Sequence, residues 1–172
     1  YARSYIPQFD WSKFRLVNVW KEDTMLVQPF RPDKNYYKVY GDFLKYSPDS
    51  TKFIDLDSYN LAISTNKSGT RIAEDIGPDT EVSLINLEDS TKTRLVFLGP
   101  GASIEDGSWL DSENIVLVGV QDNSAVTSKV IVVWKYHLPT NTFFLYESSD
   151  SVSADTIMQN WRKQRLKGVE VR

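Results

Sequence analysis

Two aspartates near the centre of the chain have the spacing of an acid–base pair. Asp55 and Asp57 lie two residues apart in a predicted strand at residues 52–56, so both side chains are expected on one face of it. Paired carboxylates carry out general acid–base chemistry or bind a hard cation. The alternative is that both line the solvated face of a sheet. The chain has no Asp-x-Asp-x-Asn-Gly loop that would complete a calcium site, and we predict no metal ligands.

Other groups for catalysis are scarce. The chain has no Cys and one His, which excludes thiolate chemistry, Cys-type zinc sites and sites built on several His ligands. His137 follows a predicted strand, and no Gly-x-Ser-x-Gly elbow is present to partner it, so we interpret it as an exposed or hydrogen-bonded turn residue. Gly99-Pro100-Gly101 lacks the ending of a phosphate loop and is interpreted as a break between sheets. The sequence predicts no catalytic residue and no cofactor, and it favours a non-enzymatic role.

Aromatic side chains are the second group that invites a functional interpretation. Tyr36, Tyr37 and Tyr40 lie in a predicted short strand at residues 36–40, and Trp20 ends another predicted strand. Exposed aromatic rings stack on sugars or anchor a protein partner, and the alternative is that they pack in the core. The candidate binding residues are therefore Trp20, Tyr36, Tyr37, Tyr40, Asp55 and Asp57. A protein or a carbohydrate is the expected partner.

The composition is that of one folded domain. The 172 residues are 41% hydrophobic and 25% charged. A net charge of -3 argues against a nucleic-acid binder, which needs a basic surface. No apolar run approaches the roughly 18 residues of a transmembrane helix. The chain starts at Tyr1 without an initiator Met, so an export signal or a lipid anchor removed upstream stays an open interpretation.

Apolar stretches separated by polar turns predict an antiparallel β fold. Residues 14–20 and 25–27, joined by a polar turn at 21–24, predict a hairpin. Residues 65–79 read as a long loop around a short strand at 71–73. The other strands are expected at residues 52–56, 61–64, 81–87, 93–98, 115–120, 129–136, 142–146 and 169–171.

One helix is predicted near the end of the chain, at about residues 154–167. Ser153 is a suitable N-cap and Gly168 stands where a glycine ends a helix. Ile157 and Trp161 share one face of it. Its basic residues either contact an anionic membrane surface or belong to a helix that covers a sheet edge with the apolar face inward; these residues are Arg162, Lys163, Arg165 and Lys167.

Two stretches repeat the order aromatic residue, turn, strand, loop, strand, turn, strand, beginning at Tyr46 and at Trp109. The turn Tyr46-Ser47-Pro48-Asp49-Ser50 resembles the aromatic-Ser-Pro-Asp-Gly turn of TolB-like and WD40-like β-propeller blades. Trp109-Leu110-Asp111 resembles a variant of that turn, and residues 133–141 resemble the third-strand segment of a blade. The resemblance covers about residues 43–147, roughly two blades. A closed propeller needs about four blades or more, so the resemblance implies a partial propeller or a sandwich-like array.

These observations predict a mainly β fold of antiparallel, blade-like sheets with one C-terminal α-helix. The chain is expected to be a single domain over residues 1–172, with blade-like repeats at about 43–98 and 104–147. The predicted function is a non-enzymatic binding or protein-interaction module. Residues 47–59 also resemble uncharacterised envelope or lipoprotein-like proteins of bacteria, which implies an extracytoplasmic location, periplasmic or lipid-anchored.

Two alternatives stay open. The first is a carboxylate-based hydrolase that uses Asp55 and Asp57. The second is a structural module that completes a larger propeller-like assembly through unpaired strand edges, which includes a homo-oligomer.

Overall fold

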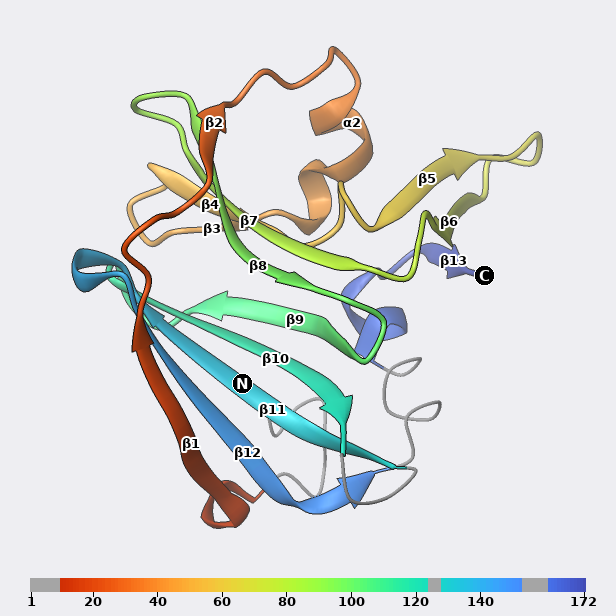
Figure 1. Ribbon diagram of the computed structural model, residues 1–172. Helices are drawn as coiled ribbons and strands as arrows, with labels where there is room; N and C mark the ends of the chain where they lie inside the picture. The colour runs from red at the N-terminus through yellow and green to blue at the C-terminus, as the bar shows by residue number, and fades with distance from the viewer. Residues whose placement is uncertain (1–9, 124–127, 153–160) are drawn as a thin grey trace.

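The computed structural model describes residues 10–123, 128–152 and 161–172. The described chain is mainly β, as predicted, and forms three sheets (Figure 1). Sheet A has five antiparallel strands in the order β1-β12-β11-β10-β9. In that order they are β1 (Phe14–Lys21), β12 (Thr142–Val152), β11 (Lys129–His137), β10 (Asn114–Asp122) and β9 (Ala102–Trp109). The strand at β9 was not predicted from the sequence.

Sheet B has five antiparallel strands in the order β2-β8-β7-β4-β3. They are β2 (Val27–Pro29), β8 (Thr91–Leu98), β7 (Thr80–Asn86), β4 (Lys52–Asp55) and β3 (Lys45–Tyr46). Sheets A and B therefore share one plan. In each sheet, four strands pair as neighbours in the order in which they occur along the chain, and a strand from the N-terminal segment pairs with the last of them.

Sheet C has three strands, two of which come from an insertion between β4 and β7. It consists of the hairpin β5 (Leu61–Thr65) and β6 (Arg71–Asp75), with β13 (Val169–Val171) parallel to β6. The predicted loop at residues 65–79 is present at 66–70 and 76–79, and the predicted short strand at 71–73 is the longer β6. The turn is tight because the Asn66 side chain accepts bonds from the backbone N–H groups of Ser68 and Thr70, and because Gly69 adopts a φ of 86°.

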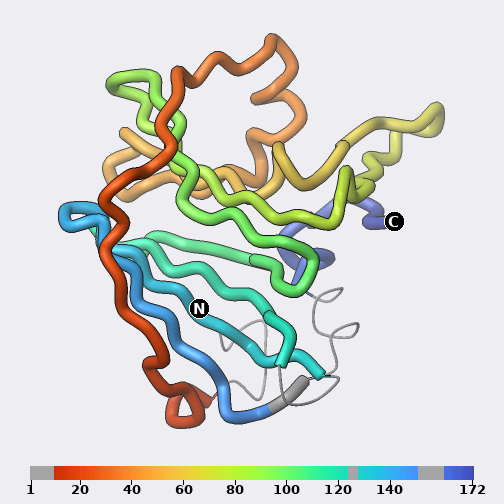
Figure 2. Tube along the Cα trace, in the orientation of Figure 1, coloured from red at the N-terminus to blue at the C-terminus, as the bar shows by residue number. Residues whose placement is uncertain are grey.

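The predicted hairpin at residues 14–27 is also wrong. β1 pairs with β12 in sheet A and β2 pairs with β8 in sheet B, so the chain crosses from one sheet to the other at residues 22–26 (Figure 2). Apolar residues around a polar turn predict two strands but do not identify their partners. Here β1 and β2 each pair with the outer edge of a sheet whose other strands come later in the sequence.

The segment at residues 36–40 is a helix, α2 (Tyr36–Tyr40), and not the predicted strand. Its residues favour strands by propensity, but helical spacing places Tyr36 and Tyr40 on one face, where both hydroxyl groups donate to acceptors in the body of the domain. Short 3-10 helices occur at Trp11–Lys13, Gly41–Phe43 and Leu138–Thr140.

The main hydrophobic core lies between sheets A and B. The sheet B side contributes Ile54, Leu56, Val82, Leu84, Leu95 and Val96, and sheet A contributes Ile104, Ile115, Leu117, Tyr136 and Phe143. A smaller cluster covers the other face of sheet A, where Trp161 packs on Val118, Ile131 and Val133.

The predicted C-terminal helix is present over residues 161–165, and Gly168 follows it with a φ of 80°. Trp161 points inward as predicted, being only 3% exposed. The predicted start of the helix, with Ile157, lies outside the described residues.

Candidate functional site

Asp55 and Tyr36, two of the predicted site residues, are brought together by β4 and α2. The Tyr36 hydroxyl donates to Oδ2 of Asp55 at 2.6 Å, and the Ser58 hydroxyl donates to the same oxygen. Oδ1 of Asp55 accepts from the backbone N–H groups of Asp57 and Ser58. Burial and the Asp55 charge raise the pKa of Tyr36, so its hydroxyl keeps its proton and remains a donor. Asp55 is thus the acceptor at the centre of a buried hydrogen-bond network.

Asp57 has a different partner. Its carboxylate forms a buried ion pair with the guanidinium of Arg165, and both side chains are at most 3% exposed. Burial alone would lower the pKa of Arg165, but the charges of Asp57, Asp106 and Glu105 outweigh it and raise the pKa. The expectation that Asp55 and Asp57 line a solvated face is therefore wrong, because both carboxylates are buried and bound internally.

Two arginines from residues 161–165 connect the C-terminal segment to the rest of the domain; we refer to Arg162 and Arg165 as the arginine clasp. Nε of Arg165 donates to the backbone oxygen of Glu105 on β9 at 2.8 Å. Nε of Arg162 donates to Oε2 of Glu105 at 3.0 Å, and its Nη1 donates to Asp75 at the end of β6 at 2.8 Å. The clasp therefore joins sheets A and C, as expected for a helix that covers a sheet edge.

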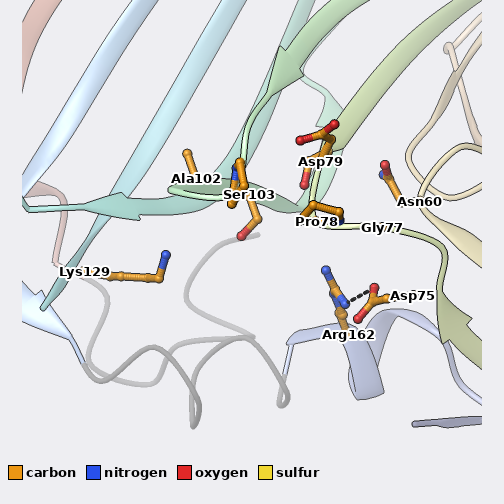
Figure 3. A pocket seen from close by; sticks show the side chains of 11 residues that line it. Asn60, Asp75, Gly77, Pro78, Asp79, Ala102, Ser103, Lys129 and Arg162 are labelled. Carbon is orange, nitrogen blue, oxygen red and sulfur yellow. Dashed lines mark hydrogen bonds and ion pairs between the residues drawn. The ribbon is translucent and has the colours of Figure 1, made fainter.

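A small polar pocket of about 180 Å³ lies beside the clasp (Figure 3). It is lined by charged residues from several elements, namely Asp75, Asp79, Lys129 and Arg162, together with Asn60, Thr80 and Ser103. Asp75 is paired with Arg162, and Lys129 is paired with Asp122 at 2.8 Å. Pockets for drug-sized ligands measure roughly 300–1,000 Å³, so this one accommodates only a small molecule.

Among the described residues that line the pocket, no base accepts a hydrogen bond from the Ser103 hydroxyl. The Ser103 hydroxyl donates to Glu105, but that carboxylate is fully buried and already paired with Arg162. Within the described residues, no group of three His, Cys, Asp or Glu side chains is arranged to hold a metal ion. His137 is bonded to Thr140 in the turn after β11, as predicted, with 2.8 Å between Nδ1 and Oγ1.

The predicted aromatic site residues serve mainly in packing. Trp20 stacks on Phe143 in the main core, with 5.1 Å between ring centroids. Tyr36 is buried, and the Tyr40 hydroxyl donates to the backbone oxygen of Leu61 at 2.8 Å. Tyr37 is 46% exposed and is the only one of the four that is exposed. The structure therefore does not gather these four residues into one surface.

The most distinctive surface was missed by the sequence prediction. Six of the 13 exposed large hydrophobic residues in the described chain lie within residues 11–27: Trp11, Leu16, Val17, Val19, Leu26 and Val27. Residues 15–19 of β1 are all exposed, and β1 is the outermost strand of sheet A. We call the outer side of β1, where no described strand pairs with it, the β1 edge; its exposed apolar residues are Leu16, Val17 and Val19. The sequence carries no signal for this surface, because apolar residues that do not alternate with polar ones are typical of a strand buried on both faces.

The comparisons with protein-family models, curated proteins and solved structures found no match for this chain. The resemblance to propeller blades therefore stays a prediction. No helix among the described residues is both long and apolar enough to cross a membrane.

Proposed function

We propose that the chain is a non-enzymatic protein-interaction module that binds an extended segment of its partner along the β1 edge. The observation that supports this most is the concentration of exposed apolar side chains on and around an outermost strand of eight residues. Such a strand presents a row of backbone donors and acceptors to which another strand can pair. Backbone bonds would supply affinity, and the exposed side chains would supply specificity.

The other edges of the two large sheets contrast with this one. β9, at the opposite edge of sheet A, is mostly buried, and Arg165 donates to one of its carbonyl groups. The outer strands of sheet B, β2 and β3, have three and two residues. Short or covered edges are how proteins prevent unwanted pairing. Among the described strands of sheets A and B, β1 is thus the long edge without such protection.

Burial of the exposed side chains of the β1 edge against a partner contributes favourably to the free energy of binding. Leu16 and Val19 are 50% and 47% exposed. Full burial of a Leu or Val side chain is worth roughly 1.5–3 kcal/mol, so covering the exposed half of each contributes about 1 kcal/mol. Those gains, added to the backbone bonds, offset the cost of ordering an extended peptide.

A displayed library of random ten-residue peptides tests this proposal. We expect the wild-type chain to select peptides rich in β-branched and aromatic residues, and the Leu16→Lys variant to bind them at least about tenfold more weakly, a loss of about 1.4 kcal/mol. Leu110→Lys is the matched control, because Leu110 is 58% exposed and lies away from β1, in the turn after β9. Selected peptides that bind the two variants equally well would refute a role for the β1 edge.

We also propose an extracytoplasmic location in a bacterial envelope. The support is the resemblance of residues 47–59 to envelope proteins. Fractionation of the native cells tests it, with the chain expected among the periplasmic or envelope-anchored proteins, and recovery in the cytoplasmic fraction would refute it.

A further inference from the structure

The exposed apolar residues of β1 lie on the face of sheet A that is turned away from the main core. Phe14 and Tyr146 pack against the hydrophobic cluster on that face. Leu16 lies directly opposite Tyr146 on β12, so it shares that face. Val19 lies opposite Phe144 and reaches the same face.

A β-bulge explains how Leu16 and Val19 share a face although they are three residues apart. The register between β1 and β12 shifts between Leu16 and Asn18, which leaves Val17 without a partner. Side chains of a regular strand alternate, so residues three apart would point to opposite faces. The extra residue in the bulge reverses that alternation for the second half of the strand.

Because of the bulge, β1 can lie opposite a second copy of itself over its full length. A two-fold axis perpendicular to a sheet pairs antiparallel strands so that opposite residues lie on the same face. In a regular strand, two residues share a face only when both have even numbers or both have odd numbers, so only such residues can lie opposite each other. In β1 the bulge shifts the alternation, so Phe14 and Lys21 share a face and can lie opposite each other. In this register all eight residues of β1 are paired. The pairs are Phe14 with Lys21, Arg15 with Trp20, Leu16 with Val19, and Val17 with Asn18.

We propose that the partner at the β1 edge is a second copy of this chain, paired antiparallel in this register. Two copies of sheet A then form one continuous sheet. Leu16 packs on Val19 of the other copy twice, once on each side of the axis. The inference rests on the proposed function and identifies its partner.

The absence of Cys from the chain makes this register directly testable. Directly opposite residues have Cβ atoms about 4.5–5.5 Å apart, near the range of a disulfide. Leu16 and Val19 lie opposite residues two apart on β12, so they are separated by roughly 7 Å along the strand, and cysteines at the same position in the two copies are out of reach. A mixture of the Leu16→Cys and Val19→Cys variants, under mild oxidation, is expected to form a covalent heterodimer. Each variant alone is expected to link at least about tenfold less, because its own cysteines are out of register.

Three measurements decide the outcome. Sedimentation should show a wild-type dimer that the Leu16→Lys variant loses and the Leu110→Lys variant keeps. A wild-type monomer at the concentrations used for oxidation, or equal cross-linking in the mixture and in each variant alone, overturns the self-pairing. If the monomer still binds library peptides through β1, the proposed function stands and only the identity of the partner is rejected.

Discussion

Two turns at one end of sheet B have the same sequence, Asp-Ser-Thr-Lys, at residues 49–52 and 89–92. In each, the Asp carboxylate accepts bonds from the backbone N–H and the hydroxyl of the Thr two residues later. In each, the Ser adopts a left-handed conformation, with φ of 59° at Ser50 and 55° at Ser90. The shared sequence therefore corresponds to a shared turn geometry, one that a glycine adopts more readily than a serine.

Replacing either serine by glycine should stabilise the domain. Ser50→Gly and Ser90→Gly each remove the steric cost of a left-handed residue, which is partly offset by the greater flexibility of glycine in the unfolded chain. We expect the free energy of unfolding to rise by about 0.5 kcal/mol for each substitution, measured by urea denaturation. Ser112→Gly is the control, because Ser112 is exposed in a turn without a positive φ and should lose about 0.5–1 kcal/mol. A loss of stability in all three variants would contradict this account of the turns.

The carboxylate of Asp49 predicts a dependence of stability on pH. Donation from Ser47 and Thr51 lowers the pKa of Asp49 from 3.8 to about 2. A pKa below that of the unfolded chain means that the bonds contribute fully above about pH 4, and that the contribution disappears as the pH falls toward about 2. We expect the stability difference between wild type and Asp49→Asn to shrink over that interval, as measured by denaturation at successive pH values. A constant difference between about pH 5 and about pH 2 would exclude this origin.

The arginine clasp holds the C-terminal segment in place. The buried ion pair in this clasp leads to a prediction about stability. Removing one partner from the ion pair of Asp57 and Arg165 leaves a buried charge without compensation. Arg165→Met and Asp57→Leu should therefore each lower the free energy of unfolding by about 3–5 kcal/mol. The double variant should recover much of that loss, because an apolar pair carries no uncompensated charge. Thermal and urea denaturation of the four proteins measures the coupling.

The exposed pair of Arg172 and Glu170 serves as the control for this element. Both side chains are about half exposed, so Arg172→Met should cost less than about 1 kcal/mol. Additive losses in the double variant of Asp57 and Arg165 would mean that the two residues act separately, contrary to the geometry of the clasp.

The elements that the sequence predicts correctly are those fixed by local patterns. β10 and β11 combine β-branched runs with polar turns, and each was expected within about two residues of its bounds. β9 escaped prediction because Glu105 and Asp106 interrupt it, and the arginine clasp that binds Glu105 lies more than fifty residues away in sequence. The same reason applies to Asp57, since a carboxylate whose partner is distant in sequence looks like a surface residue.

At the scale of the whole molecule, one hydrophobic core serves two sheets that are separate in sequence. Ile54 on β4 and Leu117 on β10 are both fully buried in that core. The N-terminal segment strengthens the connection, because β1 belongs to sheet A and β2 to sheet B (Figure 2). Sheets that share a core lose their packing together, so the domain is expected to unfold in one cooperative transition.

The distribution of tryptophan makes that cooperativity measurable. All five Trp residues lie in or against sheet A, at positions 11, 20, 109, 134 and 161, so tryptophan fluorescence reports mainly on this sheet, although Trp109 also donates to the backbone oxygen of Lys45 on β3. Ile54→Ala removes buried methyl groups from sheet B and should cost about 2–5 kcal/mol. If the sheets unfold as one unit, the fluorescence midpoint in urea falls together with the circular dichroism midpoint, although no tryptophan lies near β4 in sequence. Leu87→Ala is the control, because Leu87 is exposed and follows β7. Neither of its midpoints should shift by more than corresponds to about 0.5 kcal/mol in the free energy of unfolding. A fluorescence midpoint that stays unchanged in Ile54→Ala would mean that sheet A holds its structure without sheet B, and that the core between them does not couple the two.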